Sequence, residues 1–219
     1  MTMRYINSAH IIKFFNGLND AGVNYVLIKN IGDELPCHLP NGKDIDIVVH
    51  EDSVTVFHQY MLNNGRKVIH PYGKEAGWNN IYRLPEFEFW RLNTSDDIFV
   101  DVSNMLSCHS LTPHVWLPLD NHIQLDLWKN KVFDEENQWW IIDSNIQYVY
   151  LAVRCVLDKR CFPPAYCLEI KRKRSQIDIE KVKYYLRFVF FNFTDTLVDM
   201  LDNGDFSNVI DAYISYKDY

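Results

Sequence analysis

The chain has 219 residues, a formal net charge of −7, 47% hydrophobic residues and 15% aromatic residues. This length predicts one domain, or one domain with a helical annex, and the hydrophobic content is sufficient for a buried core. The acidic balance argues against general nucleic-acid binding, which usually needs a basic protein, although a phosphorylated small molecule can still bind in a local pocket.

The chain contains five cysteines, and no two of them form a Cys-x-x-Cys pair. Because a chain of this size does not need disulfides for stability, we expect reduced thiols in a cytoplasmic protein. Residues 1–25 lack the pattern of a signal peptide, and no apolar stretch reaches the ~18 residues of a membrane-spanning helix. The sequence therefore predicts no membrane span.

Up to residue 142 the chain alternates between helical and extended patterns. Asn7 and Ser8 are good caps for a first helix, and a second helix is predicted to begin at residues 51–53. Short runs of apolar and alternating residues predict strands over 25–29, 44–49, 67–70, 81–93, 98–106 and 123–129. A short apolar piece follows at 139–142.

After residue 142 the hydrophobic period becomes helical. Helices are predicted over 144–159, 164–174, 177–191, 194–201 and 206–216. The predicted fold class is therefore α+β. A mixed β-sheet flanked by helices occupies residues 1–142, and a helical C-terminal region occupies residues 143–219.

Two aspartates lie one residue apart in the strand predicted at 44–49. Side chains at i and i+2 of a strand share one face, so Asp44 and Asp46 project together while Ile45 and Ile47 pack behind them. Like charges held side by side are tolerated mainly where a cation lies between them, and oxygen ligands suit Mg²⁺ or Mn²⁺. The alternative is a solvated strand face with two surface aspartates.

A third acid is needed to complete such a site, and two strands compete to supply it. Asp101 lies in Phe-Val-Asp-Val-Ser and Asp126 in Gln-Leu-Asp-Leu-Trp, each between hydrophobic neighbours. We favour Asp101, because its strand follows a short turn and can lie beside the Asp44–Asp46 strand. The strand of Asp126 follows a proline-broken loop and is expected at the sheet edge.

The order helix, strand ending in Lys29-Asn30, loop, Asp44-x-Asp46 and later Asp101 resembles the nucleotidyltransferase superfamily typified by DNA polymerase beta. The resemblance covers roughly residues 8–106. It is closest to uncharacterised bacterial nucleotidyltransferase-like proteins and more distant from the LicD and fukutin-related phosphotransferases of surface-glycan pathways. One departure is that Lys29-Asn30 replaces the usual Gly-Gly or Gly-Ser turn.

The resemblance implies a magnesium-dependent transferase that moves a nucleotidyl or substituted phosphoryl group. The donor is an NTP or a CDP- or UDP-linked compound, and the acceptor is a small hydroxyl compound such as a sugar or alditol in surface-polysaccharide synthesis. By the same resemblance, Asp44, Asp46 and Asp101 are expected to hold two magnesium ions and to carry the catalysis. The residues expected to contact the donor nucleotide or its phosphates are Lys29, Asn30, Lys43 and Arg154.

Two other classes remain open at this point. The first is a catalytically inactive nucleotidyltransferase-like binding module, which the altered Lys29-Asn30 turn favours and the three acids oppose. The second is a nucleotide-sugar glycosyltransferase, which also uses Asp-x-Asp with manganese. Such an enzyme usually places a whole nucleotide-binding half before the motif, and only 43 residues precede Asp44 here.

Overall fold

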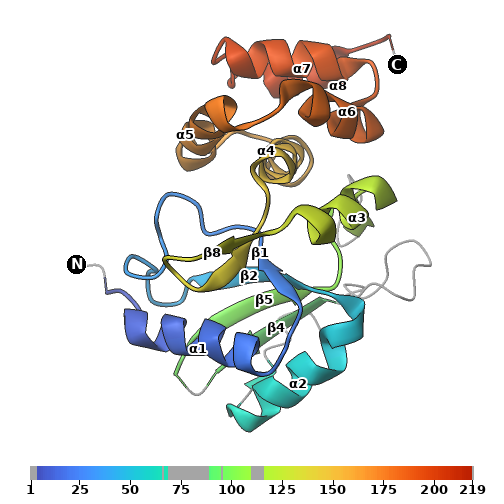
Figure 1. Cartoon of the computed structure of the whole chain (residues 1–219). Helices are drawn as coiled ribbons and strands as arrows, with labels where there is room; N and C mark the ends of the chain where they lie inside the picture. The colour runs from blue at the N-terminus through green and yellow to red at the C-terminus, as the bar shows by residue number, and fades with distance from the viewer. Residues whose placement is uncertain (1–3, 66, 69–88, 95, 110–115, 219) are drawn as a thin grey trace. The chain divides into compact units, whose positions relative to one another are not determined.

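The structure is a computed structural model that describes residues 4–65, 67–68, 89–94, 96–109 and 116–218 (Figure 1). The strand residues predicted at 69–70 and 81–88 lie outside these ranges. The chain divides into two compact units, and each unit consists of two separate segments of the sequence. The first unit contains Met1–Leu106 and Lys131–Ile142, and the second contains Ser107–Asn130 and Asp143–Tyr219.

A mixed seven-stranded sheet forms the centre of the first unit, in the order β3-β4-β5-β2-β1-β9-β8. The pairs β2–β5 and β1–β9 are parallel, and the remaining neighbours are antiparallel. The strands are β1 (Tyr25–Leu27), β2 (Asp44–Val49), β3 (Lys67–Val68), β4 (Phe89–Asn93), β5 (Phe99–Ser103), β8 (Val132–Asp134) and β9 (Trp139–Ile141). The mixed α+β fold class is thus confirmed.

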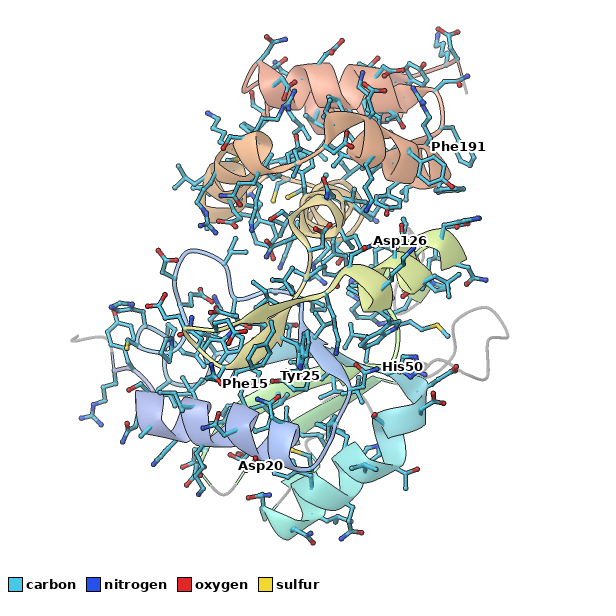
Figure 2. The ribbon with its side chains drawn as sticks, viewed as in Figure 1. Phe15, Asp20, Tyr25, His50, Asp126 and Phe191 are labelled. Carbon is cyan, nitrogen blue, oxygen red and sulfur yellow. The ribbon has the colours of Figure 1, made fainter. Side chains whose placement is uncertain are left out.

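Two helices cover one face of this sheet, α1 (Ser8–Asp20) and α2 (Val54–Asn63), the latter preceded by a 3-10 turn at Glu51–Ser53 (Figure 1). Asn7 caps α1, as predicted, by accepting a hydrogen bond from the Ala9 amide at 3.0 Å. The aromatic ring of Phe15 stacks on Tyr25 with centroids 5.7 Å apart, between α1 and the sheet (Figure 2). The core of the first unit therefore lies under α1 and α2.

The second unit is mainly helical. Its helices are α3 (Asn121–Asn130), α4 (Ser144–Val153), a π-helical turn at Arg154–Lys159, α5 (Pro164–Lys173), a 3-10 turn at Arg174–Gln176, α6 (Ile179–Phe190), α7 (Phe193–Asp202) and α8 (Val209–Ser215). A two-stranded sheet of β6 (Ser107–His109) and β7 (Trp116–Pro118) accompanies them. Asp143 caps α4, and every residue from Tyr148 to Val153 is buried. The helical C-terminal region is thus as the hydrophobic period predicts.

The strand expected at 123–129 is wrong, because this segment forms α3. Ile123 and Leu127 are fully buried while Leu125 between them is 70% exposed, so the burial follows a helical period of four. The missed signal is Asp120, whose carboxylate accepts a hydrogen bond from the His122 amide at 2.9 Å and caps the helix.

The position of α3 also changes the predicted division of the chain. The junction at 142 and 143 coincides with the predicted boundary, but Ser107–Asn130 groups with the second unit rather than with the sheet. The reason is that this segment forms β6, β7 and α3, none of which adds a strand to the seven-stranded sheet.

No helix in the described part of the chain is long and apolar enough to cross a membrane. All five cysteines are free thiols, and Cys108 and Cys155 are buried.

Candidate metal centre

Three aspartates meet where β2 and β5 lie side by side in the sheet. The strands are parallel and in register, so Asp46 lies directly opposite Asp101 and Asp44 lies opposite Phe99. One carboxylate oxygen from each of Asp44, Asp46 and Asp101 lies within 4.8 Å of the other two. The predicted convergence of Asp44 and Asp46 is confirmed, and Asp101 rather than Asp126 joins them.

The alternation of the two strands explains why the acids share one face. Ile45, Ile47, Val100 and Val102 point the other way and are fully buried in the core of the first unit. A shift of either strand by one residue would bring an aspartate into this apolar core, so the register is strongly fixed. The core therefore determines the direction of the carboxylates.

The acids are sheltered from solvent to different degrees. Asp101 is only 9% exposed, and the side chain of Asp46 is 13% exposed. Partial burial weakens the screening of charge by water, so the three carboxylates repel one another more strongly than they would on an open surface. Such a cluster is stabilised by a cation among the carboxylates.

One cation is supplied by the chain itself. The ammonium of Lys29, which is 16% exposed, forms an ion pair with the carboxylate of Asp46. The cluster therefore contains one basic side chain beside its three acidic ones. Sequence reasoning placed Lys29 near the donor phosphates and did not predict its pairing with Asp46.

Asn30 fixes the turn that precedes the loop to β2. Its φ is +69°, a left-handed conformation that asparagine tolerates better than most residues. Its side chain donates to the Asp44 carbonyl at 3.0 Å and accepts from the Asp46 amide at 3.2 Å. The side-chain amide of Asn30 therefore bonds to the edge of β2 as the backbone of one more β1 residue would. It holds the β2 backbone on both sides of Ile45.

Lys43 forms an ion pair with Glu34, which lies in the loop between β1 and β2. The same Glu34 carboxylate also accepts from the Asn30 side chain at 3.4 Å. Glu34 therefore links both ends of the loop, a role that sequence reasoning missed because no local pattern connects it to Lys43. The side chain of Lys43 remains 43% exposed, and its predicted contact with donor phosphate stays a prediction.

The remaining candidates belong to the second unit. Arg154 is 8% exposed, and its guanidinium lies 3.2 Å from the Asp158 carboxylate and 3.4 Å from the Tyr150 hydroxyl. Asp126 accepts a hydrogen bond from the Tyr185 hydroxyl. The observed contacts of both residues are structural ones within their own unit, and phosphate binding by Arg154 stays a prediction.

The donor set of the triad fits a hard divalent cation. All three groups offer carboxylate oxygens, the ligands that Mg²⁺ and Mn²⁺ prefer, and they converge closely enough to share one ion. Among the residues that the structure describes, no nitrogen or sulfur ligand joins the cluster, so its donor set differs from that of a typical zinc centre.

No known protein-family model matches the sequence, and no curated protein is significantly similar to it. The resemblance to the nucleotidyltransferases therefore rests on the sequence motif alone and stays a prediction.

Proposed function

We propose that this chain is a magnesium-dependent transferase that moves a nucleotidyl or substituted phosphoryl group from a nucleotide donor to a small acceptor hydroxyl. The observation that carries this proposal is the convergence of Asp44, Asp46 and Asp101 on two adjacent parallel strands. Carboxylates that converge on one face of a sheet, with their backbones fixed by a packed core, form a preorganised cation site.

In this proposal the three aspartates hold Mg²⁺, which supplies charge neutralisation for the donor phosphates and lowers the pKa of the acceptor hydroxyl. Asp101 is the most buried of the acids that the sequence analysis assigns to catalysis, and it accepts the proton of the acceptor hydroxyl. Asp44 and Asp46 orient the donor. Asn30 keeps both of them in place through its two hydrogen bonds to β2.

The turn at Lys29-Asn30 bears on the choice of donor. The Asn30 side chain is engaged with β2 and Glu34, so it does not offer its amide to a triphosphate as a glycine turn offers its backbone. Among the described side chains, Lys29 pairs with Asp46 at this site, and it has to exchange that carboxylate for the donor phosphate to bind it. This arrangement favours a CDP- or UDP-linked donor over an NTP, with a sugar or alditol as acceptor.

A second candidate is a catalytically inactive module that binds a partner through the same fold. The pairing of Lys29 with Asp46 favours it, because an ammonium in the acidic cluster reduces the need for a metal ion.

Calorimetry and thermal-shift titrations with Mg²⁺ distinguish these candidates. We expect Mg²⁺ to bind the wild type, and a panel of NTPs and CDP- or UDP-linked compounds to stabilise it only when Mg²⁺ is present. Asp46→Asn should lose both effects. Asp52→Asn is a matched control, because Asp52 follows β2 and its side chain is 85% exposed. An Asp46→Asn variant that still binds Mg²⁺ as the wild type does would contradict the proposal.

A further inference from the structure

A groove of about 580 Å³ opens in the first unit between the end of α1 and the β8–β9 hairpin. It is lined by polar groups of Asn16, Asp20, Asn24 and Lys131 and by the rings of Phe133 and Trp140. Its volume lies within the range of small-molecule sites. Figure 2 shows Asp20 at the C-terminal end of α1.

The groove is separate from the metal centre. The carbonyl of Asn24 accepts a hydrogen bond of 2.8 Å from the amide of His50, the residue that directly follows β2. Asp44 begins the same strand. At about 3.3 Å per residue, the two sites lie at opposite ends of a strand roughly 20 Å long. A ligand in the groove is therefore not part of the proposed transfer site.

Hydrogen-bonding groups in the groove are available to a ligand. Among the described residues, the Asn16 amide and the Asp20 carboxylate have neither a hydrogen bond nor an ion pair to another side chain or to the backbone. The Asn24 oxygen accepts a hydrogen bond from Lys131, which leaves its NH₂ group as a donor. The groove thus offers two amides and one carboxylate acceptor.

The ammonium of Lys131 is held at the wall of the groove by neutral partners. This ammonium lies 2.5 Å from the Asn24 side-chain oxygen, 3.3 Å from the Tyr25 carbonyl and 4.2 Å from the centroid of the Trp140 ring. An ammonium has three N–H donors, and these contacts use them. Lys131 therefore holds Asn24 and Trp140 in place, and its positive charge is balanced in the groove lining by the carboxylate of Asp20.

Two aromatic rings supply the apolar wall. Trp140 and Phe133 have centroids 5.0 Å apart at an interplanar angle of 61°, and both are only partly buried. A saccharide ring combines an apolar C–H face, which packs against aromatic rings, with hydroxyls that both donate and accept hydrogen bonds. A carboxylate accepts strongly from such hydroxyls, and amides donate to them.

We propose that this groove binds a neutral saccharide, with Trp140 and Phe133 packing against the sugar face and Asp20, Asn16 and Asn24 bonding its hydroxyls. Neutral ligands are favoured over charged ones because the lining carries one carboxylate, Asp20, and one ammonium, Lys131, so it has no net charge to attract an ion. The proposal does not depend on the transferase activity.

The test applies the full chain to an array of neutral, sialylated and sulfated oligosaccharides, and calorimetry then measures the best neutral compound. We expect a dissociation constant of about 1 mM or tighter, and at least a tenfold loss of affinity in Asp20→Ala and Asn16→Ala. Asp52→Ala, on the same unit but outside the groove, should bind as the wild type does. Melting temperatures of all variants control for folding.

Three results overturn the proposal. They are the absence of neutral saccharide binding, binding confined to charged glycans, and binding that is unaffected by both groove substitutions. Asp46→Asn should retain saccharide binding. Because that variant disables the metal centre, saccharide binding and Mg²⁺ binding can fail or succeed independently in the same set of proteins.

Discussion

The ammonium of Lys29 pairs with the carboxylate of Asp46, the acid that lies opposite Asp101 across the β2–β5 pair. The positive charge of Lys29, two residues after the end of β1, thus lies beside the acidic cluster. Because both side chains are largely buried, the pair is screened less than a surface ion pair. Lys29 and a divalent cation therefore compete for Asp46.

Replacing Lys29 with Met should tighten Mg²⁺ binding about tenfold, since the competing charge is removed and the net charge of the cluster becomes more negative. Calorimetric titration measures this directly. Lys13→Met is the control, because the Lys13 side chain is 66% exposed and pairs with Asp96 at the surface. Weaker Mg²⁺ binding in Lys29→Met would show that Lys29 supports the metal site rather than competing with it.

Replacing Asp46 with Asn should abolish both Mg²⁺ binding and transfer while the fold persists. In the absence of Mg²⁺ we expect the free energy of unfolding to change by no more than about 1 kcal/mol. The asparagine oxygen still accepts from Lys29, and the loss of one carboxylate relieves repulsion from Asp44 and Asp101. Thermal denaturation with and without Mg²⁺ tests both parts, and the Asp52→Asn variant should respond to Mg²⁺ as the wild type does.

The alternating pattern of β2 and β5 predicted the acidic triad from sequence, because isoleucines and valines at every second position allow only one face for the aspartates. The same reasoning failed for α3. Ile123, Leu125 and Leu127 fit a strand by their spacing of two, while Ile123 and Leu127 also fit a helix by their spacing of four. The capping residue Asp120 favours the helical period, and tertiary packing, which leaves Leu125 exposed, agrees with it.

The pairing of Lys29 with Asp46 and the links through Asn30 and Glu34 could not be predicted from local patterns. Each depends on the path of the loop from residue 30 to residue 43, which brings together side chains that no helical or extended period relates. Sequence reasoning recognised that Asn30 tolerates a left-handed backbone, and its φ of +69° agrees. It did not recognise that the side chain would bond to β2.

Substitutions of Asn30 should separate its two contributions to stability. Asn30→Gly keeps the left-handed backbone accessible but removes the bonds to Asp44 and Asp46, so we expect a loss of about 1–2 kcal/mol. Asn30→Ala loses the same bonds and adds a conformational penalty of about 1 kcal/mol. Chemical denaturation measures the difference. Equal stability of the two variants would contradict the conformational part of this account.

Lys131 should make the stability of the protein rise with pH. Burial lowers the pKa of its ammonium to about 8 in the folded protein, whereas the unfolded chain has the ordinary value of 10.5. Between these values the unfolded state holds the proton and the folded state has released it, so folding becomes more favourable as pH increases. The stabilisation is complete above 10.5 and is lost as the pH falls through 8.

The measurement compares the melting temperatures of wild type and Lys131→Met from pH 7 to pH 10. We expect the wild type to gain on the variant as pH rises, because methionine has no proton to release. Lys13→Met corrects for the titration of the other groups that the proteins share. A constant difference between wild type and Lys131→Met across this range would contradict the predicted pKa shift.

The parallel pairing of β1 with β9 has a consequence for how the protein is made. Leu27 pairs with Ile141 of β9, so this side of the central sheet cannot be completed until β9 has left the ribosome. The segment that contains β6, β7 and α3 is made before β9. During that interval the outer edge of β1 has no strand to pair with, and an open apolar edge invites association with other chains. We expect nascent chains stalled before residue 131 to need a chaperone, and chains that have released residue 142 to be independent of it.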